Sequence, residues 1–154
     1  MNQKLNSILL IDDDEPTNFL STMLIEEADC TRHLKILQSA HTALNYLHTP
    51  EISANGTSFI PPDLIFLDIN MPCMDGWEFV KEYKKLLIPT LKKTVIIMLT
   101  TSLNPDDKLK AECMPEISGF EIKPLTKEII TQTIKKYFSA EELKPGVINH
   151  SDCT

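Results

Sequence analysis

Five short apolar segments recur along the chain, and each has the length of a β-strand. Three of them are almost continuously apolar, which is typical of strands covered on both faces. The other two mix polar and apolar residues, as strands at the edge of a sheet do. The three buried candidates are residues 7–12, 63–68 and 94–100, and the two edge candidates are residues 33–37 and 119–123.

Apolar residues with helical spacing follow four of these five segments. A period near 3.6 places such residues on one face of a helix, which then packs against a sheet. The stripes are, in chain order, Phe19, Leu20, Met23, Leu24 and Glu27; Ala40, Ala43, Leu44 and Leu47; Phe79, Val80, Tyr83, Leu86 and Leu87; and Ile129, Ile130, Thr133, Ile134 and Tyr137.

The segment after the fourth strand has a weak stripe but a clear start signal. Asn104 suits the N-cap, Pro105 suits the first helical position, and two aspartates follow where the macrodipole favours negative charge. Its core face offers only Leu109, Ala111, Cys113 and the aliphatic stem of Lys108. We therefore expect a fourth helix that is loosely held.

Alternating strands and helices predict an α/β fold with a parallel sheet, helices on both faces and right-handed crossovers. At 154 residues the chain is long enough for one domain, which we place at residues 1–139. Residues 49–62 read as a surface loop. Residues 140–154 form a short polar tail, and we expect no output domain.

The charge balance narrows the range of partners. The chain has 22 acidic and 15 basic residues, a formal charge of −7, which argues against nucleic-acid binding. No run approaches the roughly 18 apolar residues of a membrane span, and the first apolar segment is too short for a signal peptide. Four scattered cysteines read as free thiols. We expect a cytoplasmic protein.

Charged and hydroxyl side chains gather where the predicted strands end. Asp12 and Asp13 end the first strand, Asp68 the third, Thr100 the fourth and Lys123 the fifth. Sites in parallel α/β sheets form outside the carboxyl ends of the strands. Three carboxylates in one place raise each other's proton affinity, and a divalent cation relieves this. Hard oxygen ligands suit Mg²⁺, so this edge predicts a Mg²⁺ site.

Asp68 stands out because it ends a buried strand beside the predicted metal. Its carboxylate is placed to act as a nucleophile toward phosphorus, with an acyl phosphate as product. Phosphoryl transfer demands in-line positioning and neutralised phosphoryl oxygens. Mg²⁺, the Lys123 ammonium and the Thr100 hydroxyl supply one group for each oxygen.

Four sequence motifs carry a family resemblance. "LLIDDDE", "IFLDINMPCMDG", "IIMLTTS" and "GFEIKP", in this order and at these separations, resemble the receiver domain of bacterial two-component response regulators, in particular stand-alone CheY-like receivers. The match spans about residues 5–139. The resemblance implies a flavodoxin-like, doubly wound sheet in the order 2-1-3-4-5 with five helices. It also implies that Asp68 accepts a phosphoryl group from the phosphohistidine of a sensor histidine kinase or phosphotransfer protein.

The resemblance also assigns the metal ligands by position. It implies that Asp13 binds Mg²⁺ directly, Asp12 directly or through water, and Asn70 through its main-chain carbonyl, all beside Asp68. Asn70 and Ser102 occupy positions that influence how easily water reaches the acyl phosphate. Both are small and polar, so they do not shield it as a bulky pair does.

The same resemblance implies how the signal leaves the domain. Thr100 is the switch hydroxyl, Phe120 the switch aromatic and Lys123 the phosphate-binding ammonium, and the Lys123–Pro124 bond is often cis in receivers. Phosphorylation then shifts the surface of the fourth helix, fifth strand and fifth helix toward an unknown downstream protein. Receivers use this same surface for homodimers.

Two alternatives from other classes stay open. A Mg²⁺-dependent phosphatase with an aspartate nucleophile needs a D-x-D motif, which Asp12 and Asp14 provide, with Thr100 and Lys123 as later motifs. That alternative leaves Asp68 idle, places Pro16 where such enzymes usually carry threonine or valine, and leaves no room for their substrate-capping insert. The other alternative is an unphosphorylated receiver-like scaffold, which would not need the complete acidic pair, acceptor, threonine and lysine.

Overall fold

The structure, a computed structural model, describes residues 4–48, 59–91 and 93–139. The predicted tail and most of the predicted 49–62 loop lie outside these residues. Strands and α-helices alternate along the described chain, with one short 3-10 helix, η1, that sequence patterning did not indicate. The elements are β1 Leu5–Ile11, α1 Glu15–Ala28, β2 Thr31–Leu37, α2 Ala40–Leu47, β3 Leu64–Asp68, α3 Gly76–Lys85, η1 Pro89–Leu91, β4 Val95–Thr100, α4 Pro105–Glu112, β5 Gly119–Ile122 and α5 Lys127–Phe138.

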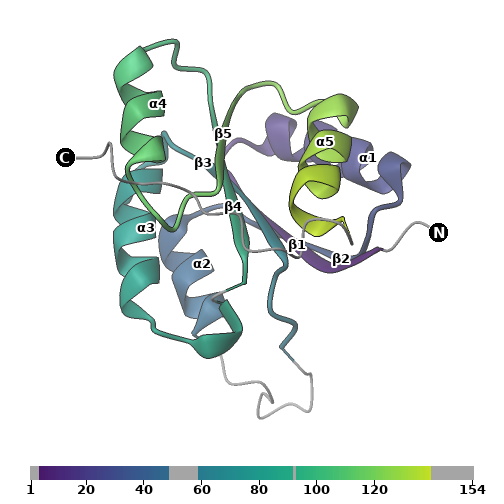
Figure 1. Ribbon diagram of the computed structural model, residues 1–154, viewed down its shortest axis with the longest axis horizontal. Helices are drawn as coiled ribbons and strands as arrows, with labels where there is room; N and C mark the ends of the chain where they lie inside the picture. The colour runs from purple at the N-terminus through teal and green to yellow at the C-terminus, as the bar shows by residue number, and fades with distance from the viewer. Residues whose placement is uncertain (1–3, 49–58, 92, 140–154) are drawn as a thin grey trace.

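The strands form one parallel sheet in the order β2-β1-β3-β4-β5. Helices α2, α3 and α4 cover one face and α1 and α5 the other (Figure 1). The predicted fold class, strand order and edge strands are therefore confirmed. Because all strands run the same way, the carboxyl ends of β1, β3, β4 and β5 meet at one edge of the sheet.

Each of the five α-helices begins at a side chain that caps its first turn. The cap oxygen accepts a hydrogen bond from a backbone N–H that has no partner inside the helix. At α3 the cap is reciprocal, since Asp75 accepts from the Glu78 N–H and Glu78 accepts from the Asp75 N–H. The five capping residues are Asp14, Ser39, Asp75, Asn104 and Thr126.

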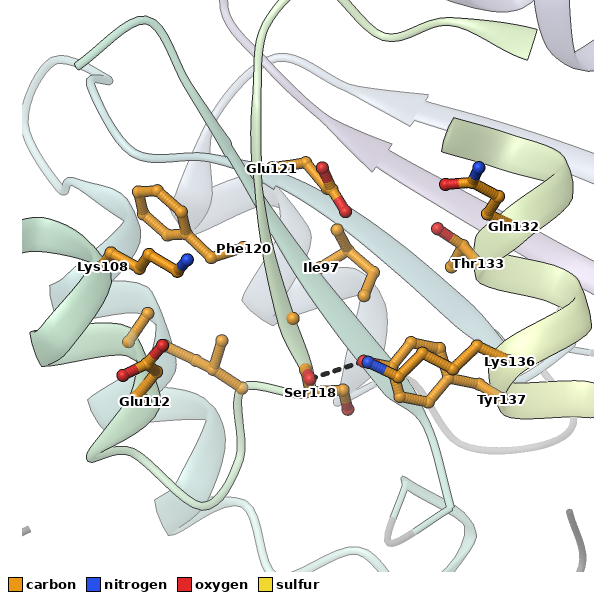
Figure 2. A pocket seen from close by; sticks show the side chains of 13 residues that line it. Ile97, Lys108, Glu112, Ser118, Phe120, Glu121, Gln132, Thr133, Lys136 and Tyr137 are labelled. Carbon is orange, nitrogen blue, oxygen red and sulfur yellow. Dashed lines mark hydrogen bonds between the residues drawn. The ribbon is translucent and has the colours of Figure 1, made fainter. Parts of the chain in front are cut away.

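The β5 edge of the sheet is hollowed between α4 and α5. A pocket of about 370 Å³ lies over β5, with Lys108 and Phe120 on the α4 side and Thr133 and Tyr137 on the α5 side (Figure 2). Tyr137 lines this pocket, and its hydroxyl donates a hydrogen bond to the Ser118 carbonyl oxygen at 2.7 Å. This pocket belongs to the surface that the resemblance implicates in signal output.

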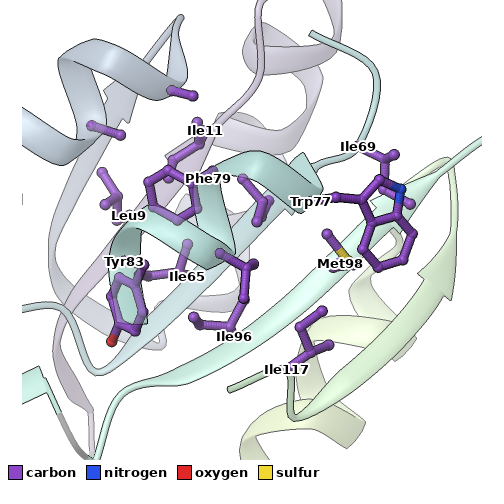
Figure 3. Close-up of a cluster of buried hydrophobic side chains, with 14 of the residues drawn as sticks. Leu9, Ile11, Ile65, Ile69, Trp77, Phe79, Tyr83, Ile96, Met98 and Ile117 are labelled. Carbon is purple, nitrogen blue, oxygen red and sulfur yellow. The ribbon is translucent and has the colours of Figure 1, made fainter. Parts of the chain in front are cut away.

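The sheet divides the hydrophobic core into two layers. One layer packs α2 and α3 against the sheet, with Phe79 fully buried and Trp77 beside Met98 and Ile117 (Figure 3). The other layer lies under α1 and α5 and includes Ile25 and Ile130. The continuous apolar runs of β1, β3 and β4 serve both layers, because successive side chains point to opposite faces.

The predicted inner face of α1 is wrong for most of its residues, although Leu24 packs partly buried against the core. Asn18, Ser21 and Ile25 are the buried residues of this helix, whereas Phe19, Leu20 and Met23 are 68%, 60% and 53% exposed. The helix begins after its Asp14 cap and is rotated so that Asn18, Ser21 and Ile25 face the sheet. Spacing alone showed an apolar stripe but not the direction in which it points.

Predictions of buried residues also fail on α3 and α4. Helix α3 ends at Lys85, and Leu87 lies beyond it, exposed and with a left-handed backbone (φ 50°). On α4, Leu109 is 57% exposed and Cys113 is also exposed, so Ala111 is the only buried residue of that helix. A short helix over the edge of the sheet has little sheet beneath it. The single buried residue agrees with the expectation of a loosely held α4.

The structure also bears on the cysteines and on membrane-spanning segments. Cys30, Cys73 and Cys113 are free thiols, as predicted, and Cys153 lies outside the described ranges. Within residues 4–48, 59–91 and 93–139, no helix is both long and apolar enough to cross a membrane.

Candidate functional site

The acidic residues predicted to meet at the sheet edge do meet there. Strands β1 and β3 pair up to Ile11 and Leu67, and Asp12 and Asp68 directly follow these two residues. Asp12, Asp13 and Asp68 each offer a carboxylate oxygen, and these oxygens lie within 4.8 Å of one another. Asp12 and Asp68 are buried, whereas Asp13 is exposed to solvent.

Lys123 reaches the cluster from the chain just after β5. Its Nζ lies 2.6 Å from Asp12 Oδ2 and 3.0 Å from Asp68 Oδ1. The three side chains are only 14%, 2% and 7% exposed, so these ion pairs are largely shielded from water. The bond between Lys123 and Pro124 is cis. One ammonium thus bridges two of the three carboxylates.

The electrostatics of the cluster leave negative charge in excess. Burial raises the pKa of Asp68, and the neighbouring charges of Asp12 and Asp13 raise it further, against the opposing effect of Lys123. Burial acts to lower the pKa of Lys123, but its contacts with Asp12 and Asp68 outweigh this and raise it. The edge therefore favours binding of additional positive charge.

Asp12 has a partner for each of its polar groups. Its N–H donates to the Leu37 carbonyl at 3.1 Å, and its Oδ1 accepts from the Asp14 N–H at 3.0 Å. Oδ2 pairs with Lys123, and the main-chain oxygen accepts from Asn18 Nδ2 at 2.8 Å. Sequence analysis missed Asn18, because a polar residue among Thr17, Ser21 and Thr22 in the first turns of a helix carries no signal that it is buried.

Glycine is required where α3 approaches the end of β3. The Gly76 N–H donates to the Ile69 carbonyl at 2.8 Å, which holds the start of α3 against the strand. A β-carbon added at Gly76 would lie 2.7 Å from the Asp68 carbonyl oxygen, closer than real contacts allow. Any side chain there would displace the backbone that carries Asp68.

Thr100 ends β4 fully buried, and its hydroxyl begins a series of hydrogen bonds along the next loop. Thr100 Oγ1 accepts from the Ser102 N–H at 3.0 Å, and Ser102 Oγ accepts from the Asn104 N–H at 3.2 Å. Asn104 Oδ1 then accepts from the Asp106 N–H at 3.0 Å, capping α4. These bonds link Thr100 to the start of α4 at intervals of two residues.

The remaining predicted residues, Phe120, Asn70 and Asp14, lie on β5, after β3 and at the start of α1. Phe120 lies opposite Met98 in the sheet, is half-buried, and packs at the border of the core on the α4 side. Asn70 is exposed two residues after Asp68, and its role as a ligand stays a prediction. Asp14 is the N-cap of α1, where hydrogen bonds from the Thr17 side chain and N–H lower its pKa.

The chemistry of this donor set fits Mg²⁺. Three carboxylates supply hard oxygen atoms, and the exposed position of Asp13 leaves room for the waters that Mg²⁺ usually retains. The arrangement also places a buried carboxylate, an ammonium and a hydroxyl at neighbouring strand ends. That combination suits the binding of a phosphoryl group.

Comparison with known proteins identifies the family. The sequence model of one protein family, the response regulator receiver domain, matches residues 8–135 of this chain. A probable methanogenesis regulatory protein, FilR2, from Methanothrix harundinacea is 30% identical over 90% of this chain and 87% of its own. The response regulator Rcp1 from Synechocystis is 33% identical over 65% of each chain. The crystal structure of a two-component response regulator from Cytophaga hutchinsonii has a TM-score of 0.76 and 34% identity, covering 88% of this chain and 98% of that one. The chain therefore belongs to the response regulator receiver domains of two-component signalling.

Proposed function

We propose that this receiver domain accepts a phosphoryl group on Asp68 from a phosphohistidine of a histidine kinase or phosphotransfer protein. An oxygen of Asp68 attacks phosphorus in line, the phosphorus–nitrogen bond breaks, and the histidine nitrogen leaves with the electron pair. The observation that carries the proposal is the contact of Lys123 with both Asp12 and Asp68 beside the exposed Asp13.

Each site residue has a separate task in this proposal. Asp12 and Asp13, with the carbonyl of Asn70, hold Mg²⁺, which neutralises phosphoryl charge when bound. Lys123 is already beside Asp68 and moves to a phosphoryl oxygen. The Ser102 N–H uses only a lone pair of the Thr100 hydroxyl, so the hydroxyl proton remains to donate to another phosphoryl oxygen.

Intact mass after incubation with Mg²⁺ and acetyl phosphate tests the acceptor. We expect one Mg²⁺-dependent phosphoryl adduct on the native protein and none on Asp68→Asn. Asp14→Asn is the matched control. It removes a carboxylate that lies near the site but caps α1 and has no task in the proposed transfer. This variant should still form the adduct.

The other outcomes of that experiment support the alternatives. Absence of an adduct on every protein would favour the unphosphorylated scaffold. Phosphate release that survives loss of Asp68 but stops in Asp12→Asn would favour the phosphatase. The phosphatase needs Asp14 as its second acid, and here that carboxylate is engaged in capping α1.

A groove beside the acceptor suits a protein donor. It has a volume of about 460 Å³, is mainly apolar, and is lined by Leu20, Met23 and Leu24 of α1 and by Lys123, Pro124 and Leu125. Lys123 belongs to both groove and site, so a protein that presents a phosphohistidine to Asp68 must lie next to it. The exposed Leu20 and Met23 give such a protein apolar surface to bury.

Donor size distinguishes docking from chemistry. We expect Leu20→Asp to leave the rate of phosphorylation by acetyl phosphate unchanged and to slow transfer from a phosphorylated histidine kinase domain about tenfold or more. Leu87→Asp is the control, since Leu87 is more exposed than Leu20 (81% against 60%) but lies beyond the end of α3. Equal slowing with both donors would contradict a docking role.

The proposed output is a shift of the surface formed by α4, β5 and α5. Binding of the phosphoryl group by Thr100 biases the loop into α4 and the packing of Phe120, and the shift follows from differential contacts in two states. Amide exchange over residues 103–118, with and without phosphorylation, should differ. Identical protection would contradict this output. Homodimerisation through the same surface stays a prediction, which the mass of the phosphorylated protein in solution would test.

A further inference from the structure

Asn18 is a buried polar residue whose surroundings are unusual. It lies near the start of α1, facing the sheet, and is 5% exposed. Its Nδ2 donates to the Asp12 main-chain oxygen through a buried bond of 2.8 Å. Among the described residues, its Oδ1 is the only buried side-chain polar atom without a hydrogen-bond partner.

The orientation of this amide follows from its single partner. A main-chain carbonyl only accepts, so Nδ2 must face Asp12, and a reversed amide would bring two acceptors together. The oxygen is then directed to a place where it forms no bond. A buried carbonyl without a partner opposes folding. What the amide contributes is therefore the bond from Nδ2.

That bond fixes the peptide unit between Asp12 and Asp13. Because the peptide is planar, holding its oxygen also orients the bond that leads into Asp13. The N–H and side chain of Asp12 are held by Leu37, Asp14 and Lys123. Asn18 is the partner that ties the carbonyl of this acidic turn to the buried face of α1.

We propose that Asn18 is a positioning residue for the cation site, orienting Asp12 and Asp13 without touching the ion. This inference rests on the proposed binding of Mg²⁺ by these two carboxylates. Residues that orient metal ligands contribute to affinity although they do not coordinate the metal. The effect should be largest for the exposed Asp13, because the hydrogen bond from Asn18 to the Asp12–Asp13 peptide restricts the orientations of the Asp13 side chain.

Calorimetric titration with MgCl₂ of Asn18→Leu, which keeps a similar volume and removes the amide, tests this role. The dissociation constant should rise about tenfold, within the range seen for outer residues of metal sites. Stability toward urea without Mg²⁺ should fall only modestly, because the substitution leaves the Asp12 main-chain oxygen without its partner but also removes the unpaired Oδ1 of Asn18. At saturating Mg²⁺, adduct formation with acetyl phosphate should recover.

Ser21→Ala is the matched control, since Ser21 is the next buried polar residue on the same face of α1. It should bind Mg²⁺ as the native protein does. Unchanged affinity in Asn18→Leu, or an equal loss in Ser21→Ala, would overturn the inference. If Asn18→Leu does not fold, Asn18→Ala is measured by the same criteria. A native protein that binds no Mg²⁺ would instead refute the proposed function.

Discussion

The two sides of Asp68 differ in how firmly they are held. On the β1 side, all polar groups of Asp12 are paired, and Lys123 joins it to Asp68 in a buried contact. On the β4 side, side-chain-to-backbone bonds at two-residue intervals lead from Thr100 to α4. That helix buries only Ala111.

In the proposed function, this difference separates the residues that bind the phosphoryl group from the helix that responds to it. A preorganised acidic pocket spends little free energy on rearrangement when charge is bound. A helix with few buried contacts opens or shifts at low free energy. We infer that the same strand edge combines a rigid half, suited to hold the proposed phosphoryl group, with a compliant half that leads to α4. Four substitutions test this division.

Removal of the shared ammonium should have the largest effect on stability. Lys123→Met leaves two buried carboxylates without their cation, which should lower the free energy of unfolding by about 3 kcal/mol without Mg²⁺. Mg²⁺ should restore part of this loss. Urea unfolding with and without Mg²⁺ measures both effects. Lys127→Met, which removes only an exposed pair with Glu27, is the control and should change little.

Removal of the Asp68 charge in Asp68→Asn should raise the free energy of unfolding, and the size of this increase should depend on pH. The folded-state pKa of Asp68 is raised, so its ionisation destabilises the fold. The native protein should therefore lose stability, relative to Asp68→Asn, as pH rises from the ordinary aspartate range through the raised pKa. Above that pKa the difference should stay constant. Urea unfolding of both proteins without Mg²⁺ over this range is decisive, and a constant difference throughout would contradict the prediction.

Loss of the α4 cap should affect the compliant half in particular. Asn104→Ala removes the last bond of the series from Thr100 and should lower stability by about 1 kcal/mol. Amide exchange should quicken in α4 while α3 stays protected. Ser39→Ala removes the cap of α2 and should cause a similar global loss without faster exchange in α4.

The smallest effect concerns the contact between α4 and α3. Lys110 Nζ lies 4.6 Å from the centre of the Trp77 ring, and Lys110→Ala should lower stability by about 0.5–1 kcal/mol. Trp77 is the single tryptophan, so its fluorescence reports the change directly. Lys108→Ala, on the same helix, should leave this fluorescence unaltered. A signal that does not respond to Lys110→Ala would exclude the contact in solution.

Much of the fold was predictable because it depends on short-range patterns. Continuous apolar runs distinguished β1, β3 and β4 from the edge strands, and Asn104 with Pro105 gave the start of α4. The inner face of α1 was not predictable in this way. Its stripe of Phe19, Leu20 and Met23 has helical spacing, but contact with the sheet goes to Asn18, Ser21 and Ile25.

The sequence by itself determined the strands, the strand ends and the acidic, hydroxyl and ammonium groups placed there. Those features follow from local hydrophobicity and from residue identity at each position. Only the tertiary structure decided that Lys123 pairs with both Asp12 and Asp68 and that Asn18 holds the Asp12 carbonyl. Such contacts depend on strand register and on the rotation of a helix about its axis, which many distant contacts set together.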